Sequence, residues 1–73
     1  SAGYISNGDD VPYTCEVRDQ TVGVQVLQVA PDSDEGFGCN NGCEITLLQT
    51  GQTIVLESDA NVEIENGELK LSR

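Results

Sequence analysis

The stretch that decides the fold of this chain is residues 61–73, which read N-V-E-I-E-N-G-E-L-K-L-S-R. Polar and apolar residues alternate strictly up to an Asn-Gly pair and alternate again after it, which is typical of a β-hairpin. A type I′ turn needs a positive φ at both central residues, and Asn66 and Gly67 tolerate that conformation better than other pairs. We therefore predict that the chain turns at these two residues.

The place of the turn fixes the register of this hairpin, because a one-residue slip would move every side chain to the other face. The predicted cross-strand pairs are Glu65 with Glu68, Ile64 with Leu69, Glu63 with Lys70, and Val62 with Leu71. The apolar residues of these pairs share one face and are predicted to point into the core. The charged residues occupy the other face.

Two more hairpins with two-residue turns are expected. A turn at Asp19-Gln20 would join strands at residues 13–18 and 21–29, because it brings apolar residues together on one face. The pairs would be Tyr13 with Val26, Cys15 with Val24, and Val17 with Val22. A turn at Thr50-Gly51 would join strands at residues 44–48 and 53–57. Its pairs would be Leu47 with Ile54 and Ile45 with Leu56.

The 73 residues of the chain are enough for one domain. No segment repeats apolar residues with a helical period, and Val, Ile and Thr dominate the alternating runs. We predict an all-β fold over residues 13–73, an antiparallel barrel or sandwich of about five to six short strands joined by hairpins. Residues 1–12 are expected to form a flexible lead-in or an edge strand, and residues 32–38 a flexible acidic loop.

The formal net charge is −10, from thirteen Asp and Glu residues against three Lys and Arg residues. Nucleic acids and anionic membrane surfaces both attract basic proteins, so this charge argues against either partner. No apolar run approaches the ~18 residues of a membrane span, and we expect no membrane insertion. A cationic partner, bound cations or a role in solubility are all compatible with the charge.

Cys15, Cys39 and Cys43 are the disulfide candidates. The last two flank Asn40-Asn41-Gly42, which suits a three-residue hairpin loop with its Gly in the left-handed conformation and the two sulfur atoms close together. A bridge from Cys15 to either of them is an alternative, as are three reduced thiols. A closed metal–thiolate site lacks its usual fourth ligand, since the chain has no His. We predict that Cys15 and Cys43 are buried and that at least one disulfide forms under oxidising conditions.

Asp32, Asp34 and Glu35 are the candidate ligands for a Ca²⁺ ion. The segment departs from the EF-hand pattern, because Phe37 stands where that pattern requires Gly and Cys43 stands where it requires Glu. An exposed acidic loop without a metal is the alternative, and no other cofactor is indicated. Catalysis is not expected, because the chain has no His and its core is too small to enclose a cleft for paired carboxylates.

No motif identifies a family. We interpret the chain as a non-enzymatic structural or interaction module of a secreted, cell-surface or virion assembly, binding a protein partner or a second copy of itself through an unpaired strand edge. The candidate edge is residues 68–72, and the candidate partner-binding residues are Glu63, Glu65 and Glu68. The alternatives are an acidic inhibitor of a cationic enzyme or toxin and a calcium-dependent binding module. The expected location is extracellular or on a virion surface.

Overall fold

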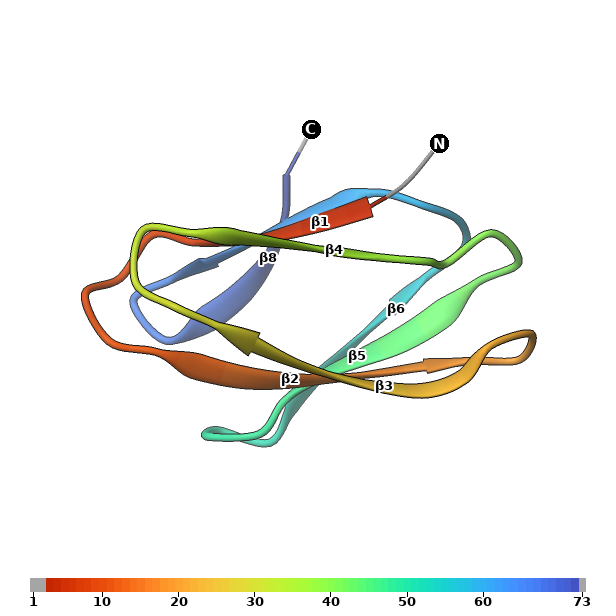
Figure 1. Ribbon diagram of the computed structural model, residues 1–73, viewed down its shortest axis with the longest axis horizontal. Helices are drawn as coiled ribbons and strands as arrows, with labels where there is room; N and C mark the ends of the chain where they lie inside the picture. Colours follow the sequence, from red (N-terminus) through yellow and green to blue (C-terminus); the bar gives the residue numbers. More distant parts are fainter. Residues whose placement is uncertain (1–2, 73) are drawn as a thin grey trace.

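A computed structural model, which describes residues 3–72, shows two four-stranded β-sheets packed face to face as a sandwich (Figure 1). The all-β prediction is confirmed, and no helix occurs within the described range. The strands are β1 (Gly3–Asn7), β2 (Tyr13–Asp19), β3 (Gly23–Val29), β4 (Asp34–Phe37), β5 (Cys43–Leu47), β6 (Gln52–Leu56), β7 (Asn61–Glu65) and β8 (Glu68–Ser72).

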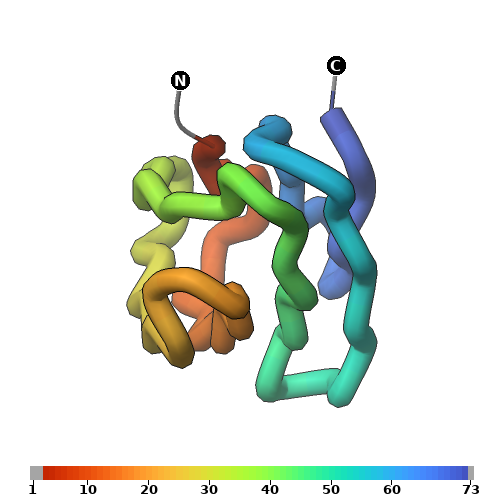
Figure 2. The backbone as a smooth tube through the Cα atoms, turned by 90° about the vertical axis from the view of Figure 1, so that its right-hand side faces the viewer, coloured from red at the N-terminus to blue at the C-terminus, as the bar shows by residue number. Residues whose placement is uncertain are grey.

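The first sheet has the strand order β4-β1-β7-β8, and the second sheet has the order β3-β2-β5-β6. All neighbours are antiparallel except β1 and β7, which run parallel. Both ends of the described chain lie on the same side of the molecule, the side of the first sheet (Figures 1 and 2). The second sheet, with β3, therefore lies on the side away from the chain ends.

Two strands form where the sequence suggests flexible segments. Residues 3–7, expected to be a lead-in or an edge strand, form the inner strand β1 between β4 and β7. Residues 34–37, expected to be part of an acidic loop, form β4. Ile5 and Phe37 anchor these strands because both side chains are buried in the core. Each strand is too short to show a recognisable alternation by itself.

The hairpin β7–β8 forms as the sequence predicts. Asn66 and Gly67 have φ values of 53° and 74°, as a type I′ turn requires. All four predicted pairs occur, from Glu65 with Glu68 to Val62 with Leu71. The predicted burial of Leu71 is wrong, since this side chain is 60% exposed. Leu71 lies near the end of the outermost strand of its sheet, where the second sheet does not cover it.

The predicted register of β2 and β3 is wrong. Asp19 pairs with Gly23 across a three-residue loop, so Tyr13 pairs with Val29 and Cys15 with Leu27. The Asp19 carboxylate accepts hydrogen bonds from the backbone N–H groups of Thr21 and Val22, at 2.6 and 3.1 Å. These bonds fold the loop locally, and Gly23 completes it with a φ of 93°. As a result, Val22, Val24 and Val26 point to solvent instead of into the core.

The register of β5 and β6 differs from the prediction by two residues. Leu47 pairs with Gln52 and Ile45 with Ile54, across a four-residue loop. The carbonyl of Leu47 accepts hydrogen bonds from the N–H groups of Thr50 and Gly51, at 3.2 and 2.8 Å, which lengthens the turn. A shift of two residues preserves the side-chain parity, so Ile45, Leu47 and Leu56 still point into the core.

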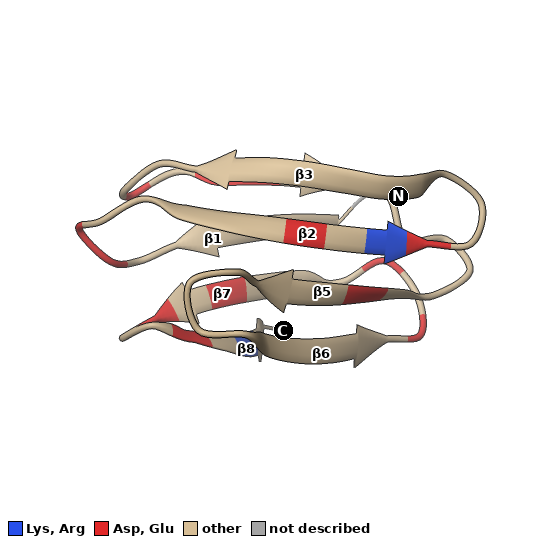
Figure 3. Ribbon diagram, turned by 90° about the horizontal axis from the view of Figure 1, so that it is seen from below, with Lys and Arg blue, Asp and Glu red and all other residues tan. Residues whose placement is uncertain are grey.

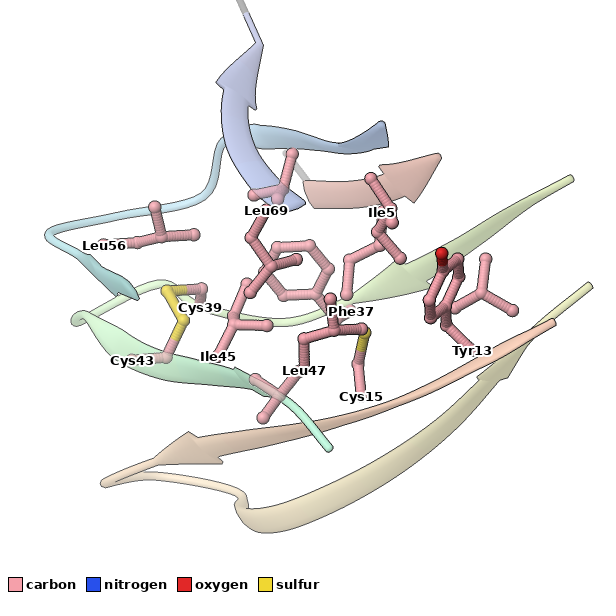
Figure 4. Packing of buried hydrophobic residues seen from close by; sticks show 14 residues of the cluster. Ile5, Tyr13, Cys15, Phe37, Cys39, Cys43, Ile45, Leu47, Leu56 and Leu69 are labelled. Atoms are coloured by element: carbon pink, nitrogen blue, oxygen red, sulfur yellow. A yellow bond between two sulfur atoms is a disulfide. The ribbon is translucent and has the colours of Figure 1, made fainter. Parts of the chain in front are cut away.

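The core lies between the two sheets and consists mainly of Val, Ile and Leu side chains. Phe37 reaches from β4 into the middle of the cluster, near Ile5 and Ile45 (Figure 4). The buried apolar residues are Ile5, Tyr13, Cys15, Val17, Val29, Phe37, Cys39, Cys43, Ile45, Leu47, Leu56, Val62, Ile64 and Leu69. Because side chains from both sheets share this one cluster, residues 3–72 fold around a single core.

The disulfide joins Cys39 to Cys43, and Cys15 is a free, buried thiol. The left-handed Gly42 is also confirmed, with a φ of 96°. The predicted hairpin between the two cysteines is wrong, because β4 belongs to the first sheet and β5 to the second. The bridge therefore closes the loop where the chain crosses between sheets. Burial raises the pKa of the Cys15 thiol to about 11, so this group stays protonated at neutral pH.

Candidate functional site

The sandwich has four edge strands, β4 and β8 in the first sheet and β3 and β6 in the second. An edge strand carries backbone N–H and C=O groups with no neighbouring strand, and such groups can pair with another chain. The surroundings of these four edges differ in charge, in length and in the hydrogen bonds that they already make. These differences locate the candidate site.

The edge of β8, which the sequence suggests as a binding edge, is already occupied at Leu69. The side-chain amide of Gln52 donates a hydrogen bond to the Leu69 carbonyl at 3.0 Å. The Leu69 N–H donates to the carbonyl oxygen of the same amide at 2.7 Å. The Gln52 amide thus imitates one pair of a neighbouring strand, and the expectation of an open edge is contradicted at this residue. Sequence reasoning missed Gln52, because its partner lies seventeen residues away.

The three candidate glutamates lie together on the β7–β8 hairpin. Glu65 and Glu68 are exposed and directly opposite each other, and Glu63 is partly buried opposite Lys70. The ammonium group of Lys70 lies 3.3 Å from a carboxylate oxygen of Glu65, which partly offsets the negative charge there. Their role in partner binding stays a prediction.

The edge of β4 is short and acidic. It has four residues, and Asp34 and Glu35 are both exposed. Asp32 is exposed in the turn just before it, with a φ of 54°. Among residues 3–72, no group of three or more His, Cys, Asp or Glu side chains is placed to hold a metal ion. The three candidate calcium ligands therefore do not form a common site in the structure.

Asn7, at the end of β1, connects the first sheet to the end of β3 through side-chain hydrogen bonds. Its side chain is almost completely buried, and its amide nitrogen donates to the carbonyls of Val11 and Val29, at 2.7 and 3.1 Å. The Asn7 side-chain oxygen accepts a hydrogen bond from the backbone N–H of Asp9 at 2.9 Å. The sequence contains a signal for this role, because Asn7 lies two residues after Ile5 and therefore points to the same, inward side of the strand.

Asp9 connects the amino-terminal region to the β7–β8 turn. Its carboxylate accepts hydrogen bonds from the Tyr13 hydroxyl at 2.7 Å and from the N–H groups of Asn66 and Gly67 at 2.8 and 2.9 Å. These three bonds, with the Tyr13 bond as the largest cause, hold the pKa of Asp9 below its ordinary value. The arrangement closes one end of the sandwich, because it ties Tyr13 and the β7–β8 turn to the same carboxylate.

The backbone of β3 is open toward solvent. On the neighbouring strand β2, the Thr14 carbonyl accepts a hydrogen bond from Leu48 N–H, and the Thr14 N–H donates to the side chain of Gln49, both at 3.0 Å and both on the β5 side. Backbone groups alternate sides along an antiparallel strand, so the β3 partners of Thr14, Glu16 and Arg18 direct their groups away from β2. These partners are Gln28, Val26 and Val24, and we call their outward backbone groups the β3 edge.

The β3 edge has no charged side chain to protect it. Residues 20–31 contain no Asp, Glu, Lys or Arg, whereas β2 and β5 carry charges on the same face (Figure 3). Val22, Val24 and Val26 are 63, 58 and 59% exposed. Natural edge strands are commonly protected by charge, proline or a bulge, or are short. With seven residues and no such protection between Gly23 and Val29, β3 is suited to receive another strand.

The edge of β6 is also uncharged, but its surroundings differ. It has five residues, and Gln52 at its start is already bonded to β8. A surface hollow of about 360 Å³ beside it is lined partly by Val55 and Leu71. A second hollow, of about 590 Å³, lies at the end of the second sheet and includes Arg18, Asp19 and Glu44 among its lining residues. Of the two edge strands of this sheet, β6 is thus the shorter, and its first residue already makes a side-chain hydrogen bond to β8.

Comparison of the chain with protein-family models, curated proteins and solved structures finds no match. Within residues 3–72, no helix is long and apolar enough to cross a membrane.

Proposed function

We propose that this chain is a non-enzymatic interaction module that binds a protein partner by accepting an additional strand at the β3 edge. The observation that carries the proposal is the outward backbone of Val24, Val26 and Gln28, with no protecting charge along the strand. In strand addition, backbone hydrogen bonds give affinity, and alternate side chains give specificity. The outward side chains of Val24 and Val26 offer the apolar contacts for this second part.

The proposed setting is a secreted, cell-surface or virion assembly. The disulfide between Cys39 and Cys43 supports an oxidising environment, because structural disulfides persist mainly outside reducing compartments. A chain of 73 residues also has a thin stability margin, and contact with a partner would bury further apolar surface. Three exposed valines on one strand and its turn are the surface available for that burial.

The test is selection of a random displayed peptide library on the folded chain, followed by binding to two variants. Val26→Lys places a charge on the β3 edge. Val55→Lys is the matched control, since Val55 is an exposed valine on β6, the other edge strand of the second sheet. We expect the selected peptides to lose binding to Val26→Lys and to keep binding to Val55→Lys.

Two results would contradict the proposed site. One is a set of selected peptides that bind Val26→Lys as well as the unchanged protein. The other is binding that depends on Glu63, Glu65 and Glu68 and falls steeply with salt, which would favour the acidic inhibitor instead. Thermal unfolding of both lysine variants checks that the fold is retained, because exposed substitutions of this kind usually change stability by less than about 0.5 kcal/mol.

A further inference from the structure

The two ends of β3 differ in charge. At the Val29 end the chain turns through Asp32 and returns as β4, so the exposed carboxylates of Asp32, Asp34 and Glu35 follow directly. Of the ion pairs in the described part of the chain, one joins Arg18 to Glu16 and the other Lys70 to Glu65. None involves the three carboxylates beyond Val29, whose negative charge is therefore not neutralised by a cationic side chain of residues 3–72.

The Gly23 end of β3 lies next to a positively charged residue, Arg18. Arg18 pairs with Val24 across β2 and β3, and its side chain is 63% exposed. Its guanidinium lies 2.9 Å from a carboxylate oxygen of Glu16, which balances its charge locally. A strand lying along β3 would thus meet a balanced charge pair near one end and uncompensated carboxylates at the other.

We infer that the partner is an extended segment with an uncharged centre and with Lys or Arg at its amino-terminal end. This segment binds antiparallel to β3, and the inference rests on the proposed function. In that orientation the amino-terminal end of the segment lies beside Val29 and meets Asp32 in the turn and Glu35, which is paired with Ile5 and so points toward the second sheet. Asp34 is paired with Ser6 on the outer face and adds to the negative charge of this end from a greater distance. Antiparallel pairing is favoured because its backbone hydrogen bonds are slightly more stable per residue than those of parallel pairing. Complementary charge at one end fixes orientation and register and speeds association.

A second copy of the chain fits this edge less well. It brings another net charge of −10 and has no Lys or Arg between residues 19 and 69. An antiparallel pair of β3 strands therefore has no cationic residue within the strands to place against Asp32 and Glu35. Arg18 and Lys70 are already engaged with glutamates of their own chain.

The inward side of β3 also favours a polar residue in the partner. The side-chain nitrogen of Gln25 is buried and has no hydrogen-bond partner among the described residues. Buried amide donors are nearly always paired in folded proteins, so an acceptor supplied by an incoming strand would satisfy this one. Threonine at the inward positions of the segment supplies such an acceptor and suits a strand.

The test uses three seven-residue peptides, as long as β3 itself. The first is acetyl-Lys-Lys-Thr-Val-Thr-Val-Thr-amide, the second replaces both lysines with glutamate, and the third places both lysines at the carboxyl end. Binding is measured by amide shifts in NMR titration of the full chain. We expect the first peptide to shift residues 23–29 and to bind about tenfold or more tightly than the second, with affinity falling as salt rises.

The carboxylates are tested with the triple variant Asp32→Asn/Asp34→Asn/Glu35→Gln, which removes the charges and keeps the size of the side chains. Asn is suitable at residue 32 because it tolerates the positive φ of that residue. We expect it to remove most of the difference between the first two peptides. Val26→Lys should abolish binding of the first peptide, whereas Val55→Lys should not.

The outcomes separate the inference from the proposed function. Equal binding of the lysine and glutamate peptides, sensitive to Val26→Lys, would leave strand addition standing and overturn the charge assignment. Tighter binding of the third peptide would overturn the antiparallel orientation. Self-association that Val26→Lys disrupts, without peptide binding, would identify a second copy as the occupant. Absence of both peptide binding and self-association would overturn the proposed function as well.

Discussion

The hairpins β7–β8 and β2–β3 both join strands with alternating apolar residues, but different groups hold their turns. In β7–β8, the conformations of Asn66 and Gly67 set a two-residue turn. In β2–β3, the Asp19 side chain holds a three-residue loop. The first hairpin buries three of its four paired apolar residues, whereas the second leaves Val22, Val24 and Val26 exposed. One carboxylate can therefore decide which face of a strand reaches the core.

The largest contrast is expected between a core residue of one hairpin and an outward valine of the other. Ile64 is completely buried on β7, and Val26 is 59% exposed on β3. Ile64→Ala should lower the free energy of unfolding by about 2–5 kcal/mol, and Val26→Ala should change it by less than about 0.5 kcal/mol. Urea unfolding measures both. A cost for Val26→Ala similar to that for Ile64→Ala would mean that β3 has the register in which Val26 faces Tyr13.

Removing the carboxylate of the β2–β3 turn should have the next largest effect. Asp19 is buried and accepts two backbone hydrogen bonds, so Asp19→Ala leaves the N–H groups of Thr21 and Val22 without this partner. We expect a loss of about 1–3 kcal/mol in the free energy of unfolding. Asp34→Ala, at an exposed position on β4, is the control and should be close to neutral. Equal effects of the two substitutions would contradict the role of Asp19.

The left-handed residue of the same turn can be tested separately. Gly23 has a φ of 93°, and a β-carbon there would meet no atom within 4 Å, so Gly23→Ala isolates the backbone strain. We expect a cost of about 1–2 kcal/mol in the free energy of unfolding. Gly38→Ala is the matched control, because its surroundings are equally open but its φ lies outside the left-handed region. That variant should be neutral or slightly more stable. A neutral Gly23→Ala would argue against this turn geometry.

The smallest effect is expected at the partly exposed Asp9, which supports the turn of β7–β8. Its pKa is lower in the folded protein than in the unfolded chain, so its stabilising contribution is complete above its ordinary pKa of 3.8 and is lost as the pH falls through the lower folded value. The difference in stability between the unchanged protein and Asp9→Asn should therefore be present at neutral pH and shrink in acid. Urea unfolding across this pH range measures it. A difference that grows in acid would contradict the assignment.

Sequence reasoning was most successful where a turn depends on the conformation of its own residues. Asn66 and Gly67 fix their hairpin in this way, and the register follows from parity. It failed at residues 19–23, although two residues there carry a signal for a longer loop. An Asp side chain such as that of Asp19 can accept a hydrogen bond from the backbone two residues later, and a Gly such as Gly23 can close a three-residue loop. The apolar pairing of the valines was more conspicuous and led to the wrong register.

The candidate site could be predicted only in part. The sequence predicted that the open strand edge lies at residues 68–72. The structure closes that edge at Leu69 with Gln52 and leaves the one at Val24, Val26 and Gln28 open. Which edge stays open depends on which strands become neighbours, and alternation within a strand carries no information on that choice.

The sequence by itself determined the all-β class, the turn at Asn66-Gly67 with its register, and the burial of Cys15 and Cys43. These features depend on φ preferences and side-chain parity over a few residues. Only the tertiary structure decided the parallel pairing of β1 with β7, the disulfide between Cys39 and Cys43 among the alternatives, and the open β3 edge. These features depend on contacts between distant segments, which form only when both sheets pack around one core. The same packing decides which edge strands have a hydrogen-bonding neighbour and which remain open to solvent.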